Sequence, residues 1–208
     1  MTAAKRLALV SVDEYLAGEL VSEVRHEYLA GRVYAMAGGR TVHNRVAGAF
    51  FGSMYTQLRG KPCEPFNSDM KVRICFPTHT RFYYPDGMVV CEPNLPESPF
   101  QDKPVVIAEV ISGSTRRIDE GEKQEAYFSI PTLTAYLLVE TNRPRVVVHR
   151  RSHPQEVFVP EEYEGLDAVI PLPAIGAELR LNDLYARVEF GTQESESEGD
   201  PDEGDATA

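Results

Sequence analysis

Two acidic residues lie among apolar neighbours, which makes them the first candidates for chemistry. Glu109 stands in the run 105–111, whose other members are all valine, isoleucine or alanine. An ionised carboxylate inside a buried strand is costly unless a cation or a metal ion compensates its charge. Three interpretations of Glu109 therefore compete: an ion-pair partner, a strand-end residue that faces solvent, or a metal ligand.

Asp86 has a similar setting, because three aromatic residues at 82–84 precede it and an apolar run at 88–90 follows. Pro85 removes one backbone donor, so it requires a sheet edge or a bulge, and bulges often redirect side chains at functional sites. Two carboxylates on neighbouring strands would offer the oxygen ligands that Mg²⁺ or Mn²⁺ prefers. A metal site and a structural polar network both remain open for this pair.

Lys123 is the third candidate, on the helix predicted after Glu109. One interpretation is an ion pair with Asp119 one helical turn away, or simply an exposed surface lysine. The other is a cation that acts together with the two acidic residues. Zinc chemistry, a phosphate-binding loop and a serine nucleophile elbow all lack their motifs in this sequence.

Patterns of apolar residues predict the elements that must position these side chains. Ser11 and Glu14 form a capping box, which predicts a short helix over 12–18. The other predicted elements are a hairpin at 26–36 that turns at Ala30-Gly31, a helix at 42–59, strands at 63–76, 81–91 and 104–112, a helix at 117–129, strands at 133–140 and 145–151, and short strands over 156–181. This order predicts an α/β or α+β fold around one central sheet, in which the strand at 104–112 is covered on both faces.

Length and composition indicate an ordinary globular protein. The 208 residues are 42% hydrophobic and 25% charged, which excludes a collagen, a coiled coil or a wholly disordered chain. No apolar run reaches the roughly 20 residues of a membrane helix, and no leader pattern stands at the N-terminus, so we expect a cytoplasmic protein. Cys63, Cys75 and Cys91 are odd in number and match no zinc spacing, which favours free buried thiols in a reducing compartment.

The charge is divided between two unlike segments. Residues 191–208 carry seven acids and no base, so they account for seven of the net −11 charges and are expected to form a disordered tail after a domain at 1–190. Residues 25–81 hold nine basic residues against three acidic ones. Such a segment could face a polyanion, although a mixed charged surface is the plainer interpretation.

Four short motifs, taken together, resemble the PD-(D/E)XK restriction-endonuclease-like superfamily, and more narrowly the putative restriction endonuclease family of small bacterial proteins. The motifs are Tyr-Tyr-Pro-Asp at 83–86, Ala-Glu-Val-Ile-Ser-Gly-Ser-Thr at 108–115, Gly-Glu-Lys-Gln-Glu-Ala-Tyr at 121–127 and Tyr-Leu-Leu-Val at 136–139. The resemblance runs from about residue 11 to 185. It implies a restriction-endonuclease-like core, with a central mixed sheet flanked by helices.

The resemblance also assigns roles to the candidate residues. Asp86 and Glu109 would bind the metal, together with the carbonyl of Val110. The lysine of the motif should stand two positions after Glu109, but Ile111 is found there, and Lys123 fits a lysine displaced to the following helix.

Two further positions match the same family. Glu27 corresponds to a glutamate near the first strand and would be an additional ligand. His43 corresponds to a position that is often polar, where a general base competes with a core or capping histidine. The turn Ser-Gly-Ser-Thr departs from the usual Ser-Pro-Ser-Thr.

The resemblance therefore implies a homodimeric DNA endonuclease that depends on Mg²⁺ or Mn²⁺, with Lys123 orienting water or neutralising charge at the phosphorus. The backbone of DNA would lie on the basic segment, where the candidates are Arg40, Arg45, Lys71 and Arg73. Two alternatives stay open. One is a catalytically inactive module that binds nucleic acid or protein, and the other is a metal-dependent hydrolase of a different phosphate ester.

Overall fold

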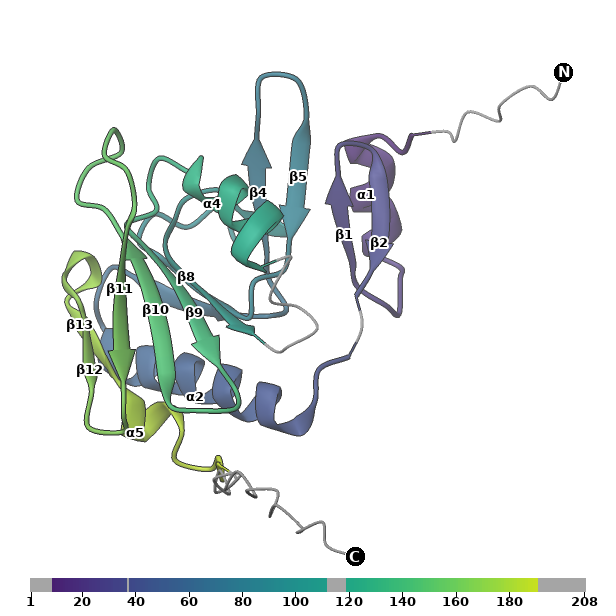
Figure 1. The fold of residues 1–208 in the computed structure, drawn as a ribbon. Coiled ribbons are helices and arrows are strands. Elements are labelled where there is room, and N and C mark those ends of the chain that lie inside the picture. The colour runs from purple at the N-terminus through teal and green to yellow at the C-terminus, as the bar shows by residue number, and fades with distance from the viewer. Residues whose placement is uncertain (1–8, 37, 112–118, 191–208) are drawn as a thin grey trace, which may run out of the picture.

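The computed structural model describes residues 9–36, 38–111 and 119–190, which form two main sheets, a small third sheet and the helices that pack on them (Figure 1). The expected tail at 191–208 and the turn at 112–115 lie outside these residues. Helices pack on a central mixed sheet, so the predicted fold class is confirmed, although a second main sheet stands beside the single one expected.

The central sheet has six strands and carries the two acidic candidates. Its strands are β3 (Glu64–Asn67), β6 (Gly87–Val90), β8 (Pro104–Ile111), β9 (Ala135–Glu140), β10 (Arg145–Arg150) and β11 (Val159–Glu164). Their spatial order is β11-β10-β9-β8-β6-β3. The sheet is mixed because β8 and β9 are parallel while the other pairs are antiparallel.

A second sheet of five strands lies beside the first. It consists of β1 (His26–Leu29), β2 (Arg32–Ala35), β4 (Lys71–Cys75), β5 (Thr80–Tyr83) and β7 (Phe100–Gln101), in the order β2-β1-β5-β4-β7. The helix α1 (Val12–Glu19) packs on this sheet through Tyr15, which contacts Tyr28 and Phe82. The capping box of Ser11 and Glu14 is formed as predicted.

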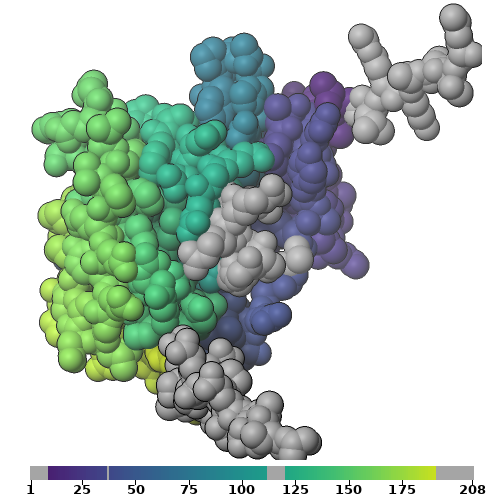
Figure 2. Space-filling model, in the orientation of Figure 1, coloured from purple at the N-terminus to yellow at the C-terminus, as the bar shows by residue number. Residues whose placement is uncertain are grey.

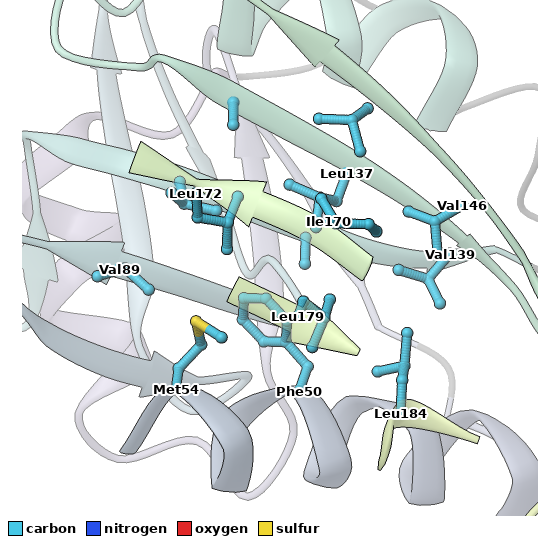
Figure 3. Close-up of a cluster of buried hydrophobic side chains, with 14 of the residues drawn as sticks. Phe50, Met54, Val89, Leu137, Val139, Val146, Ile170, Leu172, Leu179 and Leu184 are labelled. Atoms are coloured by element: carbon cyan, nitrogen blue, oxygen red, sulfur yellow. The ribbon is translucent and has the colours of Figure 1, made fainter. Parts of the chain in front are cut away.

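The helix α2 (Thr41–Leu58) crosses one face of the central sheet (Figure 1). Its apolar residues Val46, Phe50, Met54 and Leu58 recur every four positions and are all buried. They form a core with the α2-facing side of the sheet, with β12 (Val169–Leu172), β13 (Ala177–Arg180) and α5 (Leu181–Leu184), as Figure 3 shows. Pro173–Ile175 forms a single 3-10 turn between these two short strands.

The opposite face of the central sheet contains Glu109. Side chains alternate along β8, so Val106, Ala108 and Val110 belong to the α2 core, while Ile107 and Ile111 belong to a second core on the other side. This second core includes Tyr127 of α4 (Gln124–Phe128), which follows a π-helical turn at Asp119–Lys123. The strand is therefore covered on both faces, as its apolar run predicted.

Two of the predicted strands, 63–76 and 81–91, are wrong in one respect. Each is two strands that belong to different sheets: β3 and β4 in the first case, β5 and β6 in the second. The first break is a turn in which the side chain of Asn67 accepts a hydrogen bond from the amide of Asp69 at 3.0 Å. The second break contains Pro85, which has no backbone donor for a ladder. Asp86 thus lies where the chain passes from one sheet to the other.

The prediction of free buried thiols is wrong. Cys63 and Cys91 form a disulfide, and Cys75 is exposed. Cys63 precedes β3 and Cys91 follows β6, and Glu64 pairs with Val90 in the ladder of these strands. The register therefore places the two cysteines opposite each other. The expectation of a reducing compartment rested on free thiols, and the disulfide removes that argument. Within the described residues, no helix is long and apolar enough to cross a membrane.

The disulfide closes a loop with a sequence separation of 28 residues. Reduction should therefore lower the free energy of unfolding by about 3 kcal/mol, because the unfolded chain regains loop entropy. Urea unfolding with and without dithiothreitol measures this loss. Cys75→Ser serves as the matched control and should keep the full response to reductant. Equal midpoints in both conditions would contradict the expectation.

Candidate active site

The register of the central sheet brings the two acidic candidates together. Gly87 pairs with Ala108 in the antiparallel ladder of β6 and β8. Asp86 is the residue before Gly87, and Glu109 is the residue after Ala108, so the two lie side by side across the ladder. A Cβ atom on Gly87 would come within 2.5 Å of the Phe50 ring. Glycine is thus required beside Asp86 so that α2 can pack closely on β6.

Asp86 is fixed by two contacts that share one oxygen. Its Oδ2 accepts a hydrogen bond from the amide of Val110 at 2.7 Å and lies 3.0 Å from Nε2 of His43. His43 comes from the first turn of α2. Both contacts that Asp86 makes within the described residues use Oδ2, which leaves Oδ1 for a further ligand.

Glu109 is bound by side chains from the segment after β8. Its Oε1 lies 3.3 Å from Nζ of Lys123 and accepts a hydrogen bond from the hydroxyl of Tyr127 at 2.8 Å. Glu109 is 3% exposed and Lys123 is 8% exposed. The interpretations of a solvent-facing glutamate and of a surface lysine are both wrong. The ion pair and the metal ligand both remain compatible with the geometry of Glu109. The predicted pair of Lys123 with Asp119 falls on a side chain outside the described part of the structure.

Glu27 joins the site from the other sheet. Its Oε1 lies 3.1 Å from Nζ of Lys123. The same oxygen is buried and, within the described residues, accepts no hydrogen bond of good geometry. Lys123 is therefore shared by two carboxylates that come from different sheets, and Asp86 with His43 forms a second pair that is linked to the Glu109 strand through the amide of Val110.

Tyr127 is a member of the site that the sequence alone did not single out. It is fully buried and belongs to the second core, and its hydroxyl also binds Glu109. Burial and the nearby charge of Glu109 raise the pKa of Tyr127 well above its usual value, so the phenol remains a hydrogen-bond donor. The signal was its position four residues after Lys123, on the same face of the helical segment.

The four basic candidates for phosphate contacts are placed very differently. Arg40 is the exposed residue at the start of α2, and the exposed Arg45 donates to the carbonyl of Arg187 at 3.1 Å. Arg73 forms a bidentate pair with Asp102. These three can still offer charge to a polyanion at the surface.

Lys71 departs from the expectation of a phosphate contact. It is only 6% exposed and donates to the hydroxyl of Tyr84 at 3.1 Å. Burial lowers the pKa of Lys71, since the charged form loses solvation. DNA would not reach this ammonium group without displacing Tyr84. This burial could not be predicted, because the alternation in β4 does not tell which face of the strand is covered.

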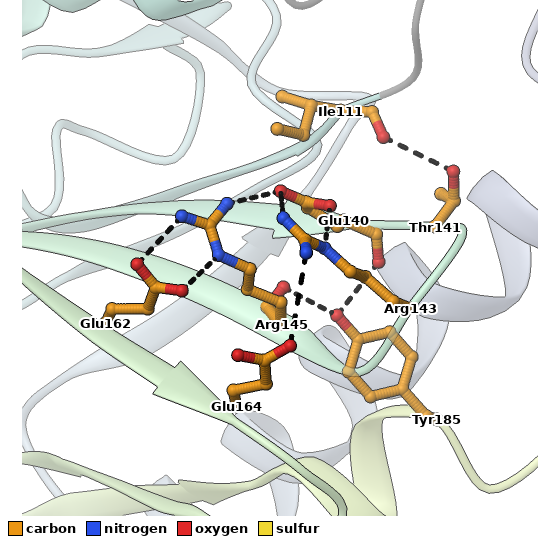
Figure 4. A network of polar contacts seen from close by, with 8 residues as sticks. All are labelled: Ile111, Glu140, Thr141, Arg143, Arg145, Glu162, Glu164 and Tyr185. Atoms are coloured by element: carbon orange, nitrogen blue, oxygen red, sulfur yellow. Dashed lines mark hydrogen bonds and ion pairs between the residues drawn. The ribbon is translucent and has the colours of Figure 1, made fainter.

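Glu140, at the end of β9, is a second buried carboxylate, and it is surrounded by arginines outside the candidate active site (Figure 4). Two arginines from the following strand and turn, Arg143 and Arg145, pair with it. Arg145 also pairs with Glu162. Two guanidinium groups compensate this one carboxylate, so the network stabilises the β9–β10 turn.

The donor chemistry of the site fits a hard divalent cation. The carboxylates of Asp86 and Glu109 carry oxygen donors of the kind that Mg²⁺ and Mn²⁺ accept, and the two contacts of Asp86 named above use its Oδ2. The described residues contain no group of three or more histidine, cysteine or acidic side chains placed to hold a metal. Mg²⁺ suits a site to which the protein contributes only a few ligands, because this ion keeps several waters and also binds phosphate oxygens.

Comparison with solved structures gives the class of fold. A protein of Anabaena variabilis ATCC 29413, described as a putative nuclease belonging to DUF820, superposes with a TM-score of 0.66 at 17% sequence identity. The match covers 85% of the present chain and 98% of the other. Together with the mixed central sheet, this likeness shows that the chain shares the fold of that protein.

Sequence comparison then gives the family. The family named Uma2, "Putative restriction endonuclease", matches residues 12–183. The uncharacterized protein slr1290 of Synechocystis sp. is 31% identical over 183 residues, which span 87% of this chain and 94% of the relative. A second Synechocystis protein, sll1609, is 30% identical over 139 residues, or 64% of this chain and 75% of that protein. The chain belongs to the Uma2 family.

Proposed function

We propose that the protein is a nuclease that hydrolyses phosphodiester bonds of DNA with the help of Mg²⁺ or Mn²⁺. The observation that carries the proposal is the arrangement of Asp86 and Glu109 on adjacent strands, with Lys123 in contact with Glu109. Membership of a family described as restriction endonucleases supports the choice of DNA as substrate. The homodimer and the cytoplasmic location stay predictions of the sequence.

The residues of the chain have separate tasks in this proposal. Asp86 and Glu109, with the carbonyl of Val110, would hold the cation, which supplies positive charge to a phosphate oxygen when bound. The amide of Val110 and His43 hold Asp86 in place through its Oδ2. Tyr127 orients Glu109, and Glu27 holds the ammonium group of Lys123 beside it. Lys123 would then stabilise negative charge that develops on the phosphate.

A second candidate function is a nuclease-like module that binds without cleaving. One observation favours it: the ammonium group of Lys123 already contacts two carboxylates. If that network is permanent, the lysine cannot serve a substrate. This alternative predicts DNA binding without turnover in Mg²⁺ and in Mn²⁺, and it predicts that replacing Asp86 leaves DNA affinity unchanged.

Metal binding separates the two candidates. We expect calorimetric titration of Mn²⁺ to show one site per chain, and Asp86→Asn should weaken this binding at least tenfold because the amide carries no charge for the cation. Asp69→Asn, at an exposed aspartate outside the site, is the control. The titration is repeated with a phosphorothioate oligonucleotide, which can complete the coordination shell. Absence of Mn²⁺ binding in both conditions would favour the binding module.

A further inference from the structure

The β1–β2 hairpin presents an exposed tyrosine next to the candidate active site. Glu27 pairs with Tyr34 in the register of the hairpin, so both side chains lie on the same face of the sheet. Glu27 contacts Lys123, which shows that this face is the one directed toward the site. Tyr34 nevertheless remains 47% exposed.

The same face also carries a cation at the surface. Arg32 lies two positions before Tyr34 and pairs with Leu29 across the hairpin, so alternation places it on the side of Tyr34. Arg32 is exposed, as are all four residues of β2. β2 is the outermost strand of its sheet, and Figure 2 shows the hairpin segment (indigo) at the molecular surface. An exposed aromatic ring and an exposed guanidinium group therefore lie on the strand that pairs with Glu27, on the same face as Glu27.

We propose that Tyr34 is a stacking platform for an unpaired base next to the scissile phosphate, with Arg32 on the adjacent phosphate. This inference rests on the proposed nuclease function and names its substrate class: DNA with a single-stranded segment at the cleavage point. Aromatic rings interleaved with basic residues bind single strands, because an unpaired base exposes a face to the ring. In an intact duplex, the neighbouring bases cover that face.

The depth of the site supports the same substrate class. Glu109 and Lys123 are almost fully buried, and Asp86 and Glu27 expose only 15% and 17% of their side chains. A phosphate must therefore come close to these recessed groups, and Tyr34 lies on the face of the hairpin that is directed toward them. A flexible single strand can bend its backbone toward such recessed groups more readily than a stiff duplex can.

Cleavage of matched DNAs tests the inference. The full chain is assayed in Mn²⁺ on one sequence presented as a duplex, as a duplex with a single-stranded extension, and as a single strand. We expect the wild type to prefer the DNAs with unpaired bases. Tyr34→Ala should lower kcat/KM on these about tenfold and leave the duplex unchanged, whereas Tyr34→Phe should retain the preference. Tyr55→Ala, at an exposed tyrosine of α2, is the matched control.

A second readout keeps this inference separable from the nuclease activity itself. Quenching of 2-aminopurine in the single-stranded extension reports stacking in metal-free buffer, where no cleavage occurs. Quenching that disappears in Tyr34→Ala and persists in Tyr34→Phe supports the platform even if no DNA is cut, in which case only the nuclease proposal fails. Equal quenching and equal preference in wild type and Tyr34→Ala would overturn the platform, whatever the activity.

Discussion

Replacing Glu109 by glutamine should reduce DNA cleavage about a thousandfold while the protein stays folded. The amide can still accept the hydrogen bond from Tyr127, but it removes the charge that would hold a divalent cation and support charge development at the phosphate. Single-turnover cleavage in Mg²⁺ and in Mn²⁺ measures the loss, and thermal unfolding shows that the fold is kept.

The choice of control makes the Glu109→Gln result specific to the site. Glu122 stands one residue before Lys123, but its side chain is half exposed and contacts Arg81 and Tyr83 instead of the buried acids. Glu122→Gln should therefore cleave DNA at nearly the wild-type rate. Undiminished cleavage by Glu109→Gln, or an equal loss in both variants, would exclude Glu109 as the metal-binding acid.

Lys123→Met should reduce both cleavage and stability. The side chain keeps its length, but two buried carboxylates, Glu27 and Glu109, lose the ammonium group that they share. Leaving buried charges without this partner should cost about 3 kcal/mol in the free energy of unfolding. Loss of a cation at the reacting phosphate should lower cleavage by about a hundredfold.

A second buried lysine separates the catalytic part of this effect from the structural part. Lys71→Met also removes an ammonium group from the interior, where it donates to Tyr84. It should change the urea unfolding midpoint but leave cleavage within a fewfold of wild type, measured where both variants are folded. If the two variants lose cleavage in proportion to their lost stability, Lys123 has no role beyond holding the fold.

Local patterns predicted most single elements correctly. The capping box at Ser11, the turn at Ala30-Gly31 and the four-residue spacing of α2 all depend on neighbours in the chain, and each is formed in the structure. The strand around Glu109 was predicted for the same reason, since a continuous apolar run requires cover on both faces. The order of the motifs predicted that Asp86 and Glu109 lie close together. This prediction required only that their two strands pair in one antiparallel ladder.

Contacts between distant segments could not be predicted. The family resemblance placed Glu27 at the site as a further ligand, but its contact with Lys123 was not predicted, because that contact depends on how two sheets lie against each other. The disulfide of Cys63 and Cys91 depends on strand register, and spacing along the chain does not reveal register. Alternation in 63–76 and 81–91 likewise looked continuous, although the chain changes sheets at Asp69 and at Pro85.

The passage of the chain between the sheets at Pro85 has a consequence for how the activity can fail. Asp86 and Glu109 are held by one ladder, whereas the Lys123–Glu27 contact spans two independently hydrogen-bonded layers. A displacement of the layers would separate the ammonium group from Glu27 and leave the pair of acids assembled. On the proposed function, such a molecule would still bind metal but would cleave DNA poorly. Metal affinity and turnover would then depend on different parts of the fold.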